Sequence, residues 1–117
     1  MNSEDFIKKI IGNGIVKTNL ESYNEIFENT PIESVTDDYW RRLLNFYNLQ
    51  NTQDKELIFE IIKQIQIDTL SSLFSFLDGN AFIEKNQEDF KLIYGSELLN
   101  GDLQDIFLSL DEDGELF

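Results

Sequence analysis

A run of acidic residues near the end of the chain is the arrangement that most resembles a site for chemistry. Residues 111–114 are Asp-Glu-Asp-Gly. A calcium-binding loop has a similar centre, with oxygen ligands at its positions 1, 3 and 5, glycine at 6 and a bidentate glutamate at 12. With Gly114 at position 6, position 12 falls beyond Phe117. We therefore expect no calcium site here.

Close pairs of carboxylates are the other candidates, because two carboxyl groups can act as general acid and general base. Three such pairs are Asp37 with Asp38, Glu88 with Asp89, and Asp102 with Asp105. Acid–base catalysis requires a partly apolar cleft that raises the pKa of one carboxyl group. These pairs fall in predicted turns and helix starts, which favour exposure to water. We predict no catalytic residue among them.

The residue types that are missing exclude most other reactions. The chain has no histidine and no cysteine, which excludes Ser-His-Asp triads, Cys-His pairs and disulfide bonds. Zinc and copper sites usually need the same two residue types. The six glycines are scattered, and none precedes a Lys-Ser or Lys-Thr pair as in a phosphate-binding loop. We expect a protein that is not an enzyme and holds no metal ion or cofactor.

Charge restricts the kind of partner. The 117 residues include 23 acidic and 9 basic side chains, which gives a net charge of −14. Nucleic acids and anionic membranes would be repelled, whereas a basic protein would be attracted. The start of the chain lacks the positive charge of a secretory signal, and no apolar run is long enough to span a bilayer. We expect a cytoplasmic protein with a basic protein partner, and we leave its oligomeric state open.

Apolar residues at helical spacing predict most of the fold. Four helices are predicted in the first two thirds of the chain, at residues 3–11, 18–29, 36–49 and 54–77. Their expected N-caps are Ser3, Thr18, Thr36 and Thr52. Gly12-Asn13-Gly14 is expected to end the first helix. In the longest helix, apolar residues cover most of the circumference beyond Ile65, which is typical of a helix surrounded by others.

The pattern changes after Gly79. Alternating apolar residues predict an antiparallel hairpin between residues 81–83 and 90–94, with a turn at 86–89. A second turn at Gly95-Ser96 leads to a short edge strand at residues 97–99, and a final helix begins after Asn100-Gly101-Asp102. We predict a single globular domain of residues 1–117 in the mostly α (α+β) class. It is a compact helical domain around a long central helix, with a small antiparallel β-hairpin before the last helix.

Negative charge is concentrated toward the end of the chain. Residues 84–117 contain 10 acids and 2 bases, whereas residues 1–83 contain 13 acids and 7 bases. Such asymmetry is typical either of a solvated tail or of an interaction face. We predict a partner-binding face that consists of one aromatic residue and seven carboxylates: Tyr94, Glu97, Asp102, Asp105, Asp111, Glu112, Asp113 and Glu115.

Some residues have two possible roles at this point. An interface needs apolar anchors inside a charged rim, and Phe117 is either such an anchor or part of the core. The same alternatives hold for Tyr39 and Trp40 in the third predicted helix. Asp68 must face water or find a hydrogen-bonding partner, such as an arginine of that helix; the alternative is a functional acid.

In size, acidity, lack of cysteine and histidine, helical body and the ending NGDLQDIFLSLDEDG, the chain resembles the small acidic immunity proteins that bacteria encode beside polymorphic or contact-dependent toxins. The resemblance is one of type and rests on no diagnostic motif. It implies a non-catalytic, cytoplasmic protein that binds a cationic toxin domain, often a nuclease, and blocks or distorts its active site. The alternative is an acidic nucleic-acid mimic or regulatory adaptor, which would bind several unrelated basic proteins.

Overall fold

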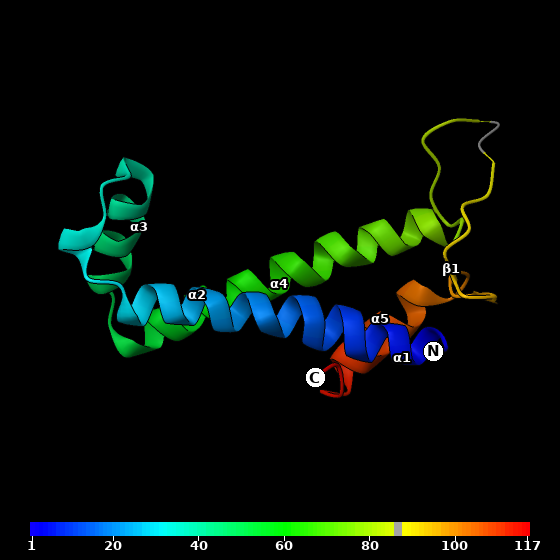
Figure 1. Cartoon of the computed structure of the whole chain (residues 1–117), viewed down its shortest axis with the longest axis horizontal. Helices are drawn as coiled ribbons and strands as arrows, with labels where there is room; N and C mark the ends of the chain where they lie inside the picture. Colours follow the sequence, from blue (N-terminus) through cyan, green and yellow to red (C-terminus); the bar gives the residue numbers. More distant parts are fainter. Residues whose placement is uncertain (86–87) are drawn as a thin grey trace.

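The structure is a computed structural model, and it describes residues 1–85 and 88–117. It begins with one continuous helical run that consists of α1 (Ser3–Asp5), the π-helical η1 (Phe6–Lys17) and α2 (Thr18–Asn29). This run is one of two long rods in Figure 1, and α4 (Thr52–Leu77) is the other. The prediction of two helices separated at residues 12–14 is therefore wrong.

Gly12 serves packing and does not stop the helix. A Cβ at Gly12 would lie 2.1 Å from the backbone oxygen of Leu116, so only glycine lets the C-terminal segment pass this close. Asn13 Nδ2 donates to the Lys8 carbonyl at 2.9 Å, and Thr18 Oγ1 donates to the Asn13 carbonyl at 2.8 Å. Both bonds span five residues, as the main-chain bonds of a π-helix do. They support the wider turns on either side of the glycines.

Three of the observed N-caps lie one residue away from the predicted positions. The observed caps are Asn2, Asp37 and Asn51, and each side chain accepts a hydrogen bond from a backbone N–H in the first turn of its helix. The predicted caps were Ser3, Thr36 and Thr52. Asn and Asp cap helices at least as well as Ser and Thr, so each neighbouring pair offered two possible caps. The fourth predicted cap, Thr18, lies inside the continuous run.

The third helix, α3 (Asp38–Asn48), stands across one end of the two rods (Figure 1). It follows a short 3₁₀ turn, η2 (Ile32–Ser34). The long helix α4 was predicted to be surrounded by others beyond Ile65, and this is wrong. Ile65 is 60% exposed and Leu73 is 51% exposed, because η1, α2 and the last helix cover only part of its circumference.

The region between α4 and the last helix contains a hairpin that differs from the main one predicted. β1 (Ile93–Tyr94) pairs antiparallel with β2 (Glu97–Leu98) around Gly95-Ser96. No strand occurs in the described parts of residues 81–92, so the predicted pairing of 81–83 with 90–94 is wrong. The Asn100 side chain binds the backbone of Phe90 and Leu92 and takes the place of a partner strand. Residues 86–87 of the predicted turn lie outside the described residues.

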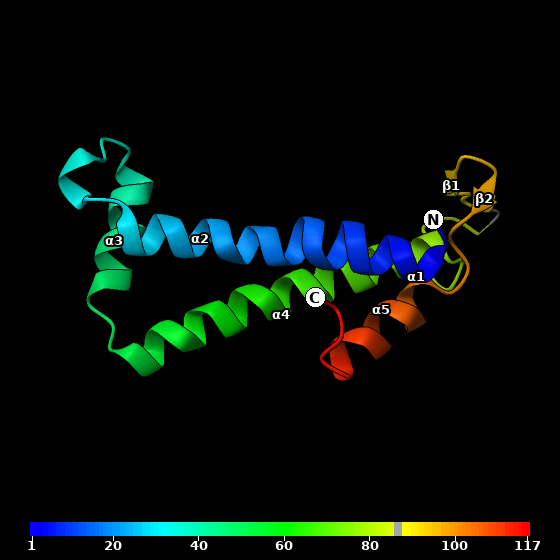
Figure 2. The same ribbon diagram turned by 60° about the horizontal axis from the view of Figure 1, so that its bottom comes forward.

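The last helix, α5 (Leu103–Glu112), packs against α4 and the start of the first run (Figure 2). Two separate groups of buried side chains hold the molecule together. The larger group joins η1, α4, α5 and the C-terminal segment: Ile7, Ile11, Ile67, Phe74, Leu103, Phe107, Leu110 and Leu116. The smaller group joins α2 to α3: Phe27, Leu44 and Tyr47.

The mostly helical fold, with a small antiparallel hairpin before the last helix, is confirmed. The outline is elongated, whereas a compact outline was predicted. The molecule measures 51 × 31 × 26 Å, with a radius of gyration of 17.8 Å; a compact domain of this length would have a radius of gyration of about 13 Å. The elongation arises because α3 lies at one end and the hairpin lies at the other (Figure 1).

Candidate functional site: an acidic surface

Two of the predicted partner-binding residues lie on the hairpin. Tyr94 and Glu97 are opposite each other in β1 and β2, and both are exposed. The hairpin lies near the start of α5 (Figure 2). The far end of α5 is about 15 Å from its start, at 1.5 Å per residue. The structure therefore groups these two residues with the first turn of α5 and not with the tail.

Asp102 and Asp105 lie at the start of α5, and both are exposed. Asp102 occupies the N-cap position, but its side chain makes no capping bond. Asp78, at the end of α4, takes this role, because its carboxylate accepts bonds from two backbone N–H groups of the α5 start at 2.7 and 2.8 Å. Asp105 lies beside Glu4 in a surface hollow of about 440 Å³. Both predicted acids are thus open to solvent.

The tail that follows α5 is held against the body of the molecule. Gly114 has a φ of +71°, and the Glu115 N–H donates to the Leu110 carbonyl at 2.8 Å, which ends the helix. Leu116 is only 2% exposed and belongs to the larger core group. The acidic run that resembles a calcium loop is therefore the C-terminus of a helix. The tail is an ordered surface and not a solvated extension.

Four predicted carboxylates lie at this end of α5. Three of them are exposed: Glu112, Asp113 and Glu115. The fourth, Asp111, forms an ion pair with α4, with 3.5 Å between Asp111 Oδ1 and Lys63 Nζ. The same ammonium group lies 5.3 Å from the ring centre of Phe117, which is 44% exposed. Lys63 therefore connects the tail to α4.

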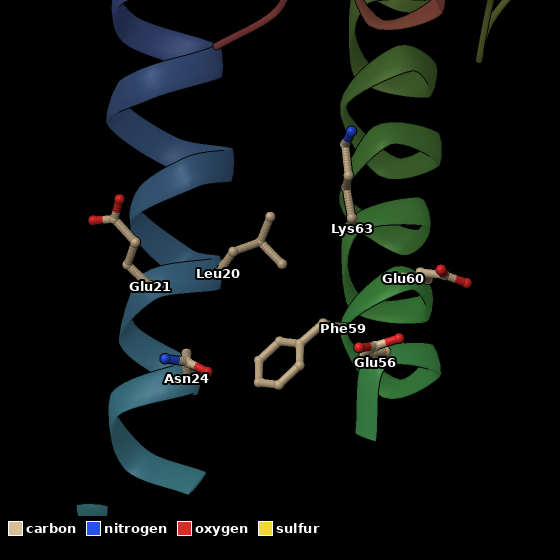
Figure 3. Close-up of a pocket in the computed structure, with 7 residues that line it drawn as sticks. All are labelled: Leu20, Glu21, Asn24, Glu56, Phe59, Glu60 and Lys63. Atoms are coloured by element: carbon tan, nitrogen blue, oxygen red, sulfur yellow. The ribbon is translucent and has the colours of Figure 1, made fainter. Parts of the chain in front are cut away.

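Lys63 also borders a cleft between α2 and α4 that sequence analysis missed. The cleft has a volume of about 510 Å³ and is lined by Leu20, Glu21, Asn24, Glu56, Phe59, Glu60 and Lys63. Leu20 and Phe59 extend toward each other from the two helices (Figure 3). We call this the acidic cleft, because three carboxylic residues lie along its edges; the side chains of Glu21 and Glu60 point outward from the gap between the helices (Figure 3).

The carboxylates of the acidic cleft have little counter-charge. Glu56 and Glu60 lie four residues apart on α4, a spacing at which like charges repel. Lys63 is near Glu60 in sequence, but its ammonium group pairs with the tail instead. Glu21 has an exposed contact of 4.0 Å with Lys17, which contributes little in water. A cationic group placed in the cleft would relieve this repulsion.

One part of the acidic cleft had a signal in the sequence. Glu56 and Glu60 are followed at the next four-residue step by Gln64 and not by a basic residue. An exposed helix that only needs solubility usually alternates the signs of its charges at this spacing. The apolar centre had no such signal, because Leu20 and Phe59 meet only through the packing of α2 on α4.

The structure also places three residues whose roles were open. Trp40 is partly buried and stacks on Tyr23, with 6.3 Å between ring centres. Its neighbour Tyr39 is 60% exposed. Asp68 is exposed and accepts a hydrogen bond from Gln64 Nε2 at 2.8 Å. Within the described residues neither arginine of α3 forms an ion pair with it.

The largest pKa shift lies outside the acidic cleft and the tail, at Tyr47 of α3. Burial raises the pKa of this tyrosine to about 12, and the hydrogen bond to Glu28 and the negative charge of that residue add to the effect. The Tyr47 ring stacks on Phe27 at 4.6 Å in the smaller core group. We assign this tyrosine a role in stability.

Comparison with known proteins gives no match to a protein-family model, a curated protein or a solved structure. In the described residues, no helix is both long enough and apolar enough to cross a membrane. The same part of the chain holds no group of three or more acidic, histidine or cysteine side chains that could bind a metal ion.

Proposed function

We propose that the chain is a non-catalytic protein that binds and neutralises a cationic protein partner. The binding surface consists of the acidic cleft and the C-terminal end of α5 with its tail, which meet at Lys63. We call the two together the acidic surface. As the resemblance to immunity proteins suggests, the partner is a toxin domain, such as a nuclease, encoded beside this chain.

The observation that carries this proposal is the composition of the acidic cleft. Leu20 and Phe59 form an apolar centre, and Glu21, Glu56 and Glu60 lie along its edges. Productive interfaces have this arrangement, with buried anchors inside a polar rim. An arginine or lysine of a partner could pack its aliphatic stem over Phe59 and place its charge among the carboxylates.

The tail adds further exposed carboxylates beside an apolar ring. Glu112, Asp113 and Glu115 are exposed next to the partly exposed ring of Phe117. On a nuclease, the side chains that bind substrate phosphates are lysines and arginines. Carboxylates that engage these side chains compete directly with the nucleic acid. Long-range attraction would set the rate of association, and the apolar anchors would set the lifetime of the complex.

The test is the rate of association with the toxin domain encoded next to this chain, measured by stopped-flow fluorescence at several salt concentrations. The double variant Glu56→Lys/Glu60→Lys should slow association by about tenfold or more at low salt, because steering depends on local charge. The difference should shrink as salt is added.

The matched control is Glu33→Lys/Glu84→Lys, which changes the net charge equally at exposed positions outside the acidic surface. It should slow association much less than the cleft variant does. Equal slowing by the two variants would show that net charge alone matters, and the proposed surface would be wrong. Failure of the chain to bind the neighbouring toxin would contradict the proposed function itself.

A further inference from the structure

The side of α4 opposite the acidic cleft carries an apolar groove. The groove has a volume of about 370 Å³ and is lined by residues of α2, α3 and α4. Its wall residues are Tyr39, Leu43 and Phe46 on α3 and Ile58, Ile62 and Ile65 on α4. The acidic cleft uses Glu56, Phe59, Glu60 and Lys63 of the same helix. The two features therefore occupy different faces of α4 and could be occupied at the same time.

The groove belongs to a larger apolar face. Between residues 39 and 65, six large apolar side chains of α3, its C-cap and α4 are half exposed or more: Tyr39 (60%), Phe46 (57%), Leu49 (84%), Leu57 (50%), Ile61 (51%) and Ile65 (60%). Leu49 lies three residues after Phe46, and Leu57, Ile61 and Ile65 repeat every four residues. These spacings place the members of each helix on one side of it. We call these six residues the apolar face.

The area of the apolar face is large for a surface that stays in water. A large apolar side chain has about 150–200 Å² to bury, so these exposed fractions leave roughly 600 Å² uncovered. The largest apolar patch on a typical monomer is about 300–600 Å². A stable interface buries about 800 Å² on each partner, including its polar rim. The apolar face is large enough for the centre of such an interface.

The shape of this region favours a second copy of the same chain. The helix α3 projects at the end of the molecule (Figure 1), and the groove lies directly between α3 and α4. A ridge beside a groove is self-complementary, because exposed side chains on α3 of each copy can enter the groove of the other. A two-fold interface requires this property, since it pairs the same patch on both subunits.

The distribution of charge also permits self-association here. The helix α3 carries one acid and two bases, Asp38, Arg41 and Arg42, although the whole chain has a net charge of −14. The hairpin lies at the opposite end of a molecule 51 Å long, and α5 packs on that half (Figure 1). Contact through α3 would keep these acid-rich segments of two copies farther apart than the screening length of about 8–10 Å.

We propose that the apolar face is a homodimer interface, in which exposed side chains on α3 of each copy pack into the groove between α3 and α4 of the other. This inference does not depend on the proposed function, because it uses the opposite face of α4. Dimerisation would leave the acidic cleft of both copies open. The dimer would therefore present two acidic surfaces to partner molecules.

The test is the molar mass of the full chain, measured by sedimentation equilibrium between about 5 and 200 µM. The expected result is a dimer of twice 13.7 kDa that tightens as salt is added, because salt screens repulsion between two acidic subunits. Ile65→Glu and Phe46→Glu each place a charge in the groove and should weaken the dimer by at least about tenfold. Circular dichroism checks that both variants remain helical.

Leu73→Glu is the matched control, because Leu73 is a half-exposed aliphatic residue of α4 that does not line the groove. It should leave the dimer intact. A wild-type chain that is monomeric over the whole concentration range would overturn the proposal, and so would a dimer that survives both groove variants. Salt distinguishes the two kinds of association. The homodimer should tighten as salt is added, whereas the complex with a cationic partner should weaken.

Discussion

At the scale of single residues, the buried hydroxyl of Tyr47 makes folding depend on alkaline pH. Its pKa is about 12 in the folded protein, raised first by burial and then by Glu28, and about 10 in the unfolded chain. The folded state therefore holds this proton more tightly. The resulting stability is complete below pH 10 and is lost as pH rises from 10 to 12, by up to about 1.4 kcal/mol per pH unit.

Tyr47→Phe should remove this part of the alkaline dependence, which urea unfolding at pH 9–12 can measure. All other side chains are the same in both proteins, so the difference isolates Tyr47. Tyr94→Phe is the matched control, because it removes the hydroxyl of a tyrosine that is 55% exposed. Equal slopes for wild type and Tyr47→Phe would contradict the assignment.

Gly12 is the second residue with a measurable role. The Cβ of Gly12→Ala would lie 2.1 Å from the Leu116 backbone oxygen, so the tail must move and lose part of its buried contact. We expect a loss of about 1–3 kcal/mol in the free energy of unfolding, as for other overpacked sites. Gly14→Ala is the control, because its nearest atom lies at 3.2 Å and alanine favours helix.

The same substitution can be tested for its cause. In a chain that lacks residues 116–117, the Cβ at position 12 has no Leu116 to meet. Gly12→Ala should then be nearly neutral, as measured by the same denaturant unfolding. If the cost stays the same in the shortened chain, it arises within the π-helical segment and not from the tail.

At the scale of elements, a residue at the end of α4 caps the start of α5. Asp78 accepts hydrogen bonds from the Gly101 and Gln104 N–H groups, so it caps a helix that starts more than twenty residues later. Asp78→Ala should cost about 1–2 kcal/mol in the free energy of unfolding. Asp102→Ala should cost almost nothing, although Asp102 occupies the N-cap position, because its side chain makes no capping bond. Similar costs for the two variants in urea unfolding would refute this assignment.

The elements also show how far local patterns predict structure. The span of α4 was predicted to within two residues, because 26 residues of helical periodicity outweigh any single position. The first run was wrongly divided at Gly12 and Gly14, since glycines usually end helices and the packing of Leu116 on Gly12 is not visible locally. The main hairpin was misplaced for a similar reason, because the Asn100 side chain binds residues 90–92 from a distance.

The candidate site could likewise be predicted only in part. The excess of carboxylates after residue 84 can be counted in the sequence, and the exposure of Glu112, Asp113 and Glu115 agrees with their polarity. The acidic cleft could not be predicted as a whole, because Leu20 and Phe59 are 39 positions apart and meet only across two packed helices. The number of charges follows from composition, whereas the apolar centre between the carboxylates depends on how the helices pack.

At the scale of the whole molecule, negative charge opposes folding. Only three ion pairs occur in the described residues, and all are partly exposed, so each contributes at most about 1 kcal/mol. Repulsion among the remaining carboxylates is long-ranged and screened by salt. Stability should therefore rise with ionic strength, which is the reverse of the behaviour of a fold held together by surface ion pairs.

This last prediction can be measured as the midpoint of thermal unfolding in sodium chloride from about 20 to 500 mM, where the screening length falls from roughly 20 Å to below 5 Å. The midpoint should rise by several degrees. Glu56→Lys/Glu60→Lys removes local repulsion and should show a smaller rise. Because salt also tightens the proposed dimer, the comparison is made in the Ile65→Glu background, in which subunit association is weakened. A midpoint that falls as salt is added would mean that the ion pairs outweigh the repulsion, and the electrostatic basis of the acidic surface would then be wrong.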